Sequence, residues 1–148
     1  MKALLQRVTS ASVCVDGIEI GSIGTGLCVF VGVANGDSEK DADWLVSKLV
    51  NLRIFADDAG KFNRSLMDVA GELLLVSQFT LMADARHGRR PGFTDAAPPG
   101  EAERLFNVFV EKSRAIGVRV ATGRFQTYMD VSIRNDGPVT ILLDSDDF

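Results

Sequence analysis

A proline between two strand-like runs constrains most strongly how this chain can fold. Apolar and polar residues alternate from Met129 to Arg134, and residues 139–143 are almost entirely apolar. Between these runs, Pro138 cannot donate a hydrogen bond to a neighbouring strand, and it pushes Gly137 away from helical backbone angles. The bond before a proline is also the one at which a cis peptide costs little. The sequence predicts a tight turn here and leaves open whether the Gly-Pro pair has a function of its own.

The length and composition are typical of one globular domain. A chain of 148 residues can bury a substantial core, so we expect a single domain over residues 1–148. Hydrophobic residues make up 46% of the chain, which is ordinary for a soluble protein. No apolar run is long enough to span a bilayer, and the first apolar stretch breaks at Gln6 and Arg7 instead of forming a signal peptide. These features favour a cytoplasmic protein that makes no membrane contact.

The two cysteines favour structural thiols over a metal site. Cys14 and Cys28 both lie in apolar, strand-like runs, where buried free thiols are common. Neither belongs to a C-x-x-C pair or to a spacing typical of metal ligands. We therefore expect neither a metal nor another cofactor.

One basic cluster offers a place for RNA. The net charge of −4, from 16 basic and 20 acidic residues, argues against a protein that coats nucleic acid, but it allows RNA binding at a local patch. Arg86, Arg89 and Arg90 lie close together in the segment ARHGRRPG. This segment is either a solvated loop or a loop whose guanidinium groups contact phosphates.

The pattern of strands and helices predicts an α/β domain that is strand-rich and mixed in topology, with two main helices. The first helix begins near Ser38, with Asp41 as its capping-box partner, and the second starts after Pro98-Pro99 and ends at Gly117. A hairpin turns at Asp16-Gly17. The expected strands cover residues 2–9, both arms of the hairpin, 26–34, a segment from residue 52, 72–81, 118–121, 125–134 and 139–143, and residues 144–148 form a frayed acidic tail.

The strand expected at residues 72–81 ends in polar residues. Ser77, Gln78 and Thr80 follow four apolar residues, and a buried strand does not require them. Either the strand reaches the surface there, or its end lines a pocket. In a pocket, Ser77 and Thr80 would supply hydroxyls, and backbone N–H groups would face an oxyanion.

No familiar catalytic set accompanies these residues. The chain has one histidine, His87 in the basic loop, and it lacks a G-x-S-x-G elbow, an H-E-x-x-H pair and the glycine-rich phosphate motifs. A catalytic triad would have to use His87. An enzyme built from these parts would position an already reactive substrate and stabilise charge with backbone groups.

Along nearly its whole length the chain resembles the D-aminoacyl-tRNA deacylase family. Two signature motifs carry the likeness, SQFTL at residues 77–81 and NDGPVT at residues 135–140, about sixty residues apart. The segments MKALLQRVTSASVCVDG, NLRIFADDAGKFNRSL and GRRPGFTDAAPP are also similar to the family. The resemblance implies the family's fold, a barrel-like core of β-sheet with two main helices.

The resemblance also implies an activity and an assembly. The family hydrolyses the ester that joins a D-amino acid to tRNA, and it forms homodimers. Each site combines residues 77–81 of one subunit with Gly137-Pro138 of the other. A cis Gly137-Pro138 bond would direct backbone carbonyls at the α-carbon of the substrate and exclude L side chains by clash, although it would not exclude achiral glycine.

The family's site residues carry over to matching positions of this chain. We expect the substrate's 2′-hydroxyl to assist the attack of water, N–H groups near Gln78 and Phe79 to hold the oxyanion, and Thr80 to position groups instead of acting as a nucleophile. The resemblance implies catalytic roles for Ser77, Gln78, Phe79 and Thr80, a chiral filter and substrate contacts from Gly137, Pro138, Phe125 and Met129, and tRNA contacts from Arg86, Arg89 and Arg90.

Two departures from the family pattern leave other functions open. Gln126 and Thr127 stand where the family has two small residues, and Gly92 stands where it has serine. The first change would suit a paralogue that deacylates glycyl- or L-alanyl-tRNA. A sister group with a trans Gly-Pro bond clears other mischarged tRNAs, but the intact SQFTL motif favours the D-specific branch. A non-catalytic RNA- or protein-binding domain is the remaining alternative, and the complete signature motifs argue against it.

Overall fold

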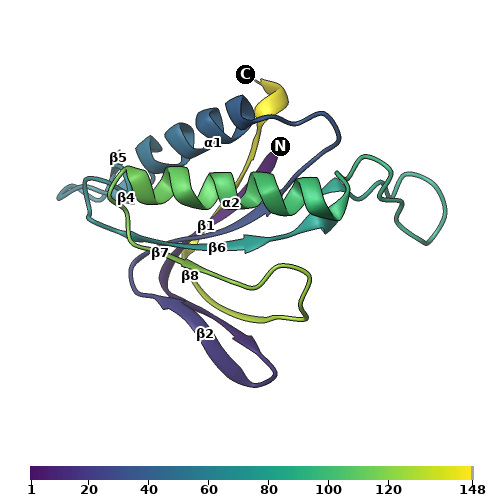
Figure 1. The fold of residues 1–148 in the computed structure, drawn as a ribbon. Helices are drawn as coiled ribbons and strands as arrows, with labels where there is room; N and C mark the ends of the chain where they lie inside the picture. The colour runs from purple at the N-terminus through teal and green to yellow at the C-terminus, as the bar shows by residue number, and fades with distance from the viewer. Residues whose placement is uncertain (148) are drawn as a thin grey trace.

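The computed structural model describes residues 1–147, and in them one six-stranded sheet carries two helices on one face (Figure 1). The strands β4 and β5 form a separate small sheet. The expected mixed α/β class with two main helices is confirmed. The elements in chain order are β1 (Lys2–Val15), β2 (Ile18–Ile23), β3 (Gly26–Gly32), α1 (Glu39–Asn51), β4 (Phe55–Ala56), β5 (Phe62–Arg64), β6 (Glu72–Ser77), η1 (Phe79–Met82), α2 (Pro99–Ala115), β7 (Val120–Thr122), β8 (Asp130–Asp144) and η2 (Ser145–Asp147).

Three strands pair with β1, which therefore organises the sheet. Residues 2–8 of β1 run antiparallel to β3, and residues 11–15 run antiparallel to β2. β8 pairs antiparallel with β1 along both of these segments. The turn between β1 and β2 lies at Asp16 and Gly17, whose φ angles are 52° and 77°, as a two-residue hairpin requires. The expected hairpin is confirmed, but β1 runs into it without the break that the sequence predicts near Thr9.

The sheet curls until the two ends of its strand order approach each other. That order is β2-β1-β3-β6-β7, with β6 parallel to both β3 and β7. A Cβ atom built on Gly21 of β2 would lie 3.0 Å from the backbone oxygen of Thr122 in β7. A glycine allows this close approach of two backbones. The result is the barrel-like core that the resemblance implies.

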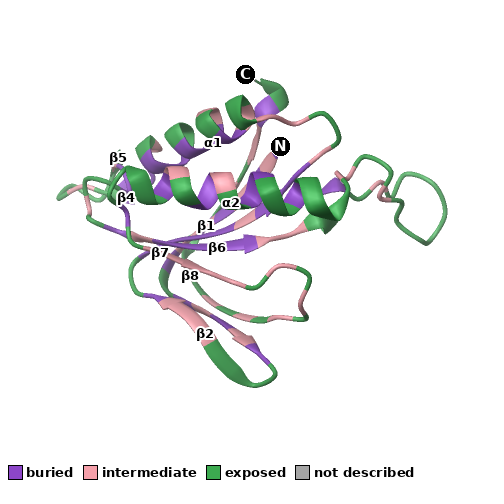
Figure 2. Cartoon of the chain, in the orientation of Figure 1, coloured by how far each residue is buried: buried purple, intermediate pink, exposed green. Residues whose placement is uncertain are grey.

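The two helices pack side by side over the larger of two apolar clusters, and the second cluster lies on the other face of the sheet (Figure 2). Ser38 and Asp41 form the expected capping box at the start of α1. Desolvation would raise the pKa of Asp41, but hydrogen bonds from Ser38 and Ser145 hold it below its ordinary value. The positive φ of 92° at Gly117 ends the second helix as expected. The buried stripes are Ala42, Leu45, Val46 and Leu49 in α1, and Ala102, Leu105, Phe106, Phe109 and Val110 in α2.

β8 corrects the prediction made from Pro138. The sequence predicts two strands joined by a turn, whereas residues 130–144 form one strand that keeps its direction against β1. Gln6 pairs with Thr140 and Val8 pairs with Asn135. Residues 136–139 therefore lie opposite Arg7 alone. The Gly-Pro segment is an enlarged bulge, four residues opposite one, in a continuous strand pair, because the two strands regain their pairing beyond it.

β6 is shorter than the strand expected at residues 72–81. It ends at Ser77, and residues 79–82 form a single 3₁₀ turn. The change occurs at Gln78, where φ is −142° and ψ is 83°. The backbone N–H of Leu81 then donates to the oxygen of Gln78, which closes the turn and turns the chain away from the sheet.

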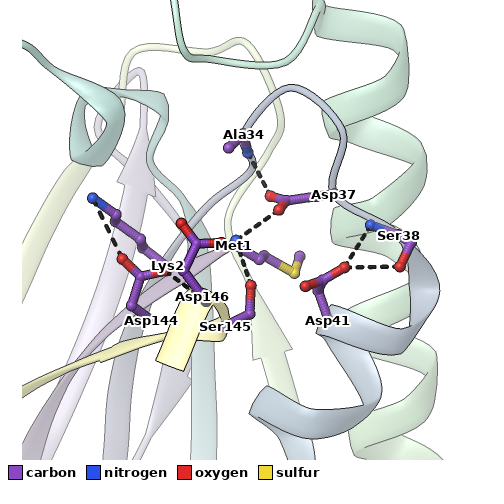
Figure 3. A network of polar contacts seen from close by, with 9 residues as sticks. All are labelled: Met1, Lys2, Ala34, Asp37, Ser38, Asp41, Asp144, Ser145 and Asp146. Atoms are coloured by element: carbon purple, nitrogen blue, oxygen red, sulfur yellow. Dashed lines mark hydrogen bonds and ion pairs between the residues drawn. The ribbon is translucent and has the colours of Figure 1, made fainter. Parts of the chain in front are cut away.

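The two termini meet in a polar network beside α1 (Figure 3). The ammonium group of Met1 lies 2.7 Å from Asp37 Oδ1 and donates to Ser145 Oγ at 2.7 Å. Ser145 is buried and belongs to the η2 turn, so the expected fraying of residues 144–148 is wrong for its first part. A buried hydroxyl with a charged partner is held in place because leaving it unpaired is costly. Phe148, the end of that tail, lies outside the described residues.

Within residues 1–147, no helix is long and apolar enough to cross a membrane. In the same range, no group of three or more His, Cys, Asp or Glu side chains could hold a metal ion. Cys28 is buried, and desolvation raises the pKa of its thiol to about 12, which leaves it protonated.

Candidate active site

The polar end of β6 opens into a cavity of about 1070 Å³. Ser77, Gln78 and Phe79 line it on one side, and Phe125 and Met129 line it on another. Five of the residues expected in the site are thus brought together from two segments far apart in sequence. The start of α2 closes a third side. Sequence reasoning missed Phe93, which lines the cavity and packs against the ring of Phe79 with a centroid distance of 4.9 Å.

The 3₁₀ turn after β6 leaves backbone donors at the cavity. The first N–H groups of a helical turn have no acceptor within it, and among the described residues no hydrogen bond takes the N–H of Phe79 or Thr80. The N–H of Gln78, in contrast, donates to Val31 O at 2.8 Å. The Gln78 N–H is therefore occupied, and the oxyanion contact expected near Gln78 and Phe79 stays a prediction for which, in the described part of this turn, only the N–H groups of Phe79 and Thr80 are open.

Thr80 does not line the cavity within the described residues. Its hydroxyl accepts a short hydrogen bond from the side-chain amide of Gln78. Among the described residues, no histidine or carboxylate contacts it. The arrangement lacks the base that a threonine nucleophile needs, and it fits a side chain that orients Gln78.

The Gly-Pro bulge is held by Arg7, a residue that sequence reasoning did not assign to the site. The Arg7 guanidinium donates to Asp136 O at 3.2 Å and to Ile54 O at 2.5 Å, and it lies 3.1 Å from the Asp136 carboxylate. The Arg7 Cζ atom also lies 5.2 Å from the ring centre of Phe62, a cation–π contact. Arg7 thus joins the bulge to the β4–β5 segment. In the sequence, the only sign of this role of Arg7 is a positive charge within an apolar stretch, and it lies 129 residues from Asp136.

Gly137 has no room for a side chain. Its φ is 126°, in the region that favours glycine. A Cβ atom there would lie 2.8 Å from the Val139 side chain and 3.1 Å from the Arg7 guanidinium. The Gly137-Pro138 bond is cis, as the resemblance implies. Neither Gly137 nor Pro138 lines the cavity of its own chain.

The basic loop at residues 83–98 projects from the rest of the fold, beyond the start of α2 (Figure 1). Arg86 pairs with Asp84 through two guanidinium hydrogen bonds of 2.8 Å. These bonds lower the pKa of Asp84 and raise that of Arg86. For Arg89 and Arg90, no ion pair is found within residues 1–147. Arg86 is thus partly neutralised, whereas the other two arginines remain open to an anion. None of the three lines the cavity.

Comparison with known proteins places the chain in one family. The family model described as D-Tyr-tRNA(Tyr) deacylase matches residues 4–144, and the chain belongs to that family. A D-aminoacyl-tRNA deacylase of Dehalococcoides mccartyi (strain ATCC BAA-2266) is 60% identical over 147 residues, which covers 99% of this chain and 96% of that protein. A protein of the same name from Thermomicrobium roseum is 59% identical and covers 98% of this chain and 94% of its own.

Solved structures share the fold. One titled c-Myc DNA Unwinding Element Binding Protein superimposes with a TM-score of 0.92 at 45% sequence identity, over 97% of this chain and 98% of that one. A second, titled as a probable eukaryotic D-amino acid tRNA deacylase, has a TM-score of 0.82 at 18% identity and covers 96% and 97%. The second likeness shows the fold alone.

Replacing Arg7 should destabilise the chain. Arg7→Ala removes hydrogen bonds from a largely buried guanidinium and leaves the bulge without its anchor, so we expect the free energy of unfolding to fall by about 2–3 kcal/mol. Urea denaturation at pH 7 measures it. The control Arg114→Ala breaks an exposed pair with Glu111, which is worth about 0.5 kcal/mol or less. Equal losses in the two variants would show that Arg7 does not anchor the bulge.

Proposed function

We propose that the chain hydrolyses the ester of D-aminoacyl-tRNA and releases free D-amino acid and tRNA. Membership of the D-Tyr-tRNA(Tyr) deacylase family over residues 4–144 carries this proposal. The relatives named D-aminoacyl-tRNA deacylase at 60% and 59% identity support it. Such an enzyme works on tRNA in the cytoplasm, where aminoacyl-tRNA is made and used.

The chemistry uses positioning and backbone donors. An aminoacyl ester on ribose is activated and has a 2′-hydroxyl beside it, so no strong nucleophile is required from the protein. Water attacks the ester carbonyl with help from that hydroxyl, and the free N–H groups of Phe79 and Thr80 stabilise the negative charge on the oxygen. The C–O bond to ribose then breaks and the ribose oxygen takes up a proton. Gln78 is oriented for this by its bond to the Thr80 hydroxyl.

Selection against L-amino acids requires a second copy of the chain. The backbone around Gly137 and Pro138 acts as the filter, because backbone atoms cannot move aside for a side chain as a rotamer can. The cavity lining of a single chain omits both residues. A homodimer supplies them from the partner, so that each site combines residues 77–81 of one protomer with the bulge of the other.

An apolar row that the single chain covers only in part supports a surface for this dimer. Leu4 of β1 pairs with Phe30 of β3 and with Leu142 of β8, and residues paired directly across strands share one face of a sheet. The helices cover the opposite face, to which Ala3 and Leu5 point. Leu142 is 54% exposed in the single chain. Leu142 lies on β8, the strand that also carries the Gly-Pro bulge, and this puts the bulge near the proposed interface.

One observation favours a paralogue with a different amino-acid range. Gln126 and Thr127, which replace small residues of the family pattern, both line the cavity. They would change the volume and polarity available to the amino acid or to the terminal adenosine. Glycyl-tRNA and L-alanyl-tRNA are the substrates to compare, and a preference for either over the D ester would identify the paralogue.

The pure protein should deacylate D-tyrosyl-tRNA and spare L-tyrosyl-tRNA, because the filter rejects only the L side chain. Release of labelled amino acid under identical conditions measures both rates. Thr80→Ala should retain measurable activity on the D ester, since Thr80 orients Gln78 without forming a bond to the substrate. Loss of nearly all turnover in Thr80→Ala, with tRNA still bound, would identify Thr80 as the nucleophile. Survival of both esters with wild-type protein would contradict the proposed function.

Leu142→Glu should convert a dimer to a monomer, because a carboxylate in the centre of an apolar interface stays uncompensated. Sedimentation equilibrium measures the mass, and the same sample should lose deacylase activity. Ile18→Glu is a matched control, since Ile18 is 68% exposed on the β1–β2 hairpin. A wild-type monomer, or an active Leu142→Glu monomer, would contradict the cross-subunit site.

Charge reversal at Arg89 and Arg90 should weaken tRNA binding. Each phosphate contact contributes about 0.7–0.9 to the slope of log affinity against log salt, so the double variant to Glu should bind more weakly and with a smaller slope. Filter binding over a range of salt concentrations measures both. Arg114→Glu, at the far end of α2, serves as the charge-matched control. If the salt dependence of binding is unchanged in the double variant, these arginines do not contact tRNA phosphates.

A further inference from the structure

The loop between β7 and β8 presents two different faces at the mouth of the cavity. Phe125, Thr127 and Met129 are partly buried, whereas the residues that alternate with them, Arg124 and Tyr128 among them, are exposed. Residues 125–129 all line the cavity. The loop therefore has an inner side that is partly buried and an outer side that is exposed at the rim of the cavity.

Tyr128 is the most exposed of the large apolar side chains, at 92%. It is also the only tyrosine of the chain. Within residues 1–147 its ring makes no aromatic contact, and its hydroxyl makes no hydrogen bond. Aromatic rings stabilise proteins and interfaces mainly when they are buried, and the Tyr128 ring is not buried in the single chain. The position offers a flat apolar surface to whatever crosses the rim.

The backbone that carries Tyr128 is held in place. The Thr127 hydroxyl lies 3.0 Å from Arg124 O and 3.2 Å from Phe125 O. Gln126 has a φ of 53°, which gives the loop a sharp turn. On the inner side, the Met129 sulfur occupies the space that a Cβ at Gly123 would need. A ring on such a loop loses little backbone freedom when it binds.

Arg124 adds a positive charge to the same outer side. It is exposed, and no carboxylate pairs with it among the described residues. A cation beside an aromatic ring is the combination that binds single-stranded nucleic acid, in which the cation contacts a phosphate and the ring stacks on a base. This exposed pair stands at the edge of the cavity, where a polynucleotide attached to a nucleoside inside it can pass.

We infer that Tyr128 stacks on an unpaired base of the acceptor end that precedes the acylated terminal nucleoside, and that Arg124 contacts the adjoining phosphate. This inference rests on the proposed function, since it takes the ester in the cavity to be attached to tRNA. It assigns the outer side of the loop to RNA and the inner side to the amino acid and terminal nucleoside.

Binding of two labelled RNA hairpins, neither of them acylated, tests the inference directly. Both have the same acceptor-stem duplex, and one has a four-nucleotide single-stranded 3′ tail while the other is blunt. Fluorescence anisotropy should show that Tyr128→Ala weakens binding of the tailed hairpin about tenfold and leaves the blunt one unchanged. Tyr128→Phe keeps the ring and should bind like wild type. Arg124→Ala should weaken the tailed hairpin and reduce its salt slope by about 0.7.

Ile18→Ala is the matched control for loss of an exposed apolar side chain and should change neither hairpin. Equal weakening of the tailed and blunt hairpins by Tyr128→Ala would overturn the inference. So would a wild-type protein that binds the two hairpins equally, or an unchanged affinity in Tyr128→Ala.

Two acylated substrates distinguish this inference from the proposed function. Tyr128→Ala should raise KM for D-tyrosyl-tRNA about tenfold and leave kcat/KM for D-tyrosyl-adenosine, which lacks the preceding nucleotides, at the wild-type value. An equal loss on both substrates would place the ring in the amino-acid or nucleoside site and overturn the inference. A wild-type protein that hydrolyses neither ester but still prefers the tailed hairpin would contradict the proposed function alone.

Discussion

The pairing of β1 with β8 on both sides of an interruption is the constraint on which the proposed site depends. The strands pair at Gln6 and Thr140, lose their register, and pair again at Val8 and Asn135. Four residues on β8 must therefore fit opposite Arg7. They have no pairing partners of their own on β1, so they bulge. The Arg7 guanidinium donates to Asp136 O, and the Val139 N–H donates to Asn135 Oδ1. The position of Gly137 and Pro138 is thus fixed by pairing beyond each end of the bulge.

Because of the way β6 leaves the sheet, the proposed site can use backbone N–H groups in place of reactive side chains. β6 lies between two parallel neighbours, and its interior residues Leu73 to Val76 are buried. Polar groups become available only where it leaves the sheet, at Ser77 and the 3₁₀ turn after it. The turn exposes backbone N–H groups because its first donors lack acceptors. A site made in this way stabilises charge with fixed dipoles, which suits a substrate that is already activated.

Local patterns predicted the local structure of this chain and failed where distant segments meet. The capping box at Ser38, the helix stripes and the Asp16-Gly17 hairpin depend on neighbours in sequence, and all are found. The Asn-Asp-Gly-Pro segment has the composition of a turn, but its conformation is set by β1, which lies more than a hundred residues away. The role of Arg7 was missed for the same reason. The polar end of β6 was found because its composition differs from that of the buried strand before it.

The proposed contacts with substrate divide between two sides of one loop at the cavity. Burial alternates along the β7–β8 loop, so Phe125 and Met129 are partly buried at the cavity while Tyr128, which also lines it, is exposed at the rim. Changes on the outer side can then alter contacts with the polynucleotide without altering the space for the amino acid. The filter proposed for Gly137 and Pro138 lies on another strand and is held by other contacts. In this proposal, selection of the amino acid and binding of the RNA depend on separate parts of the chain, so that one can vary while the other is kept.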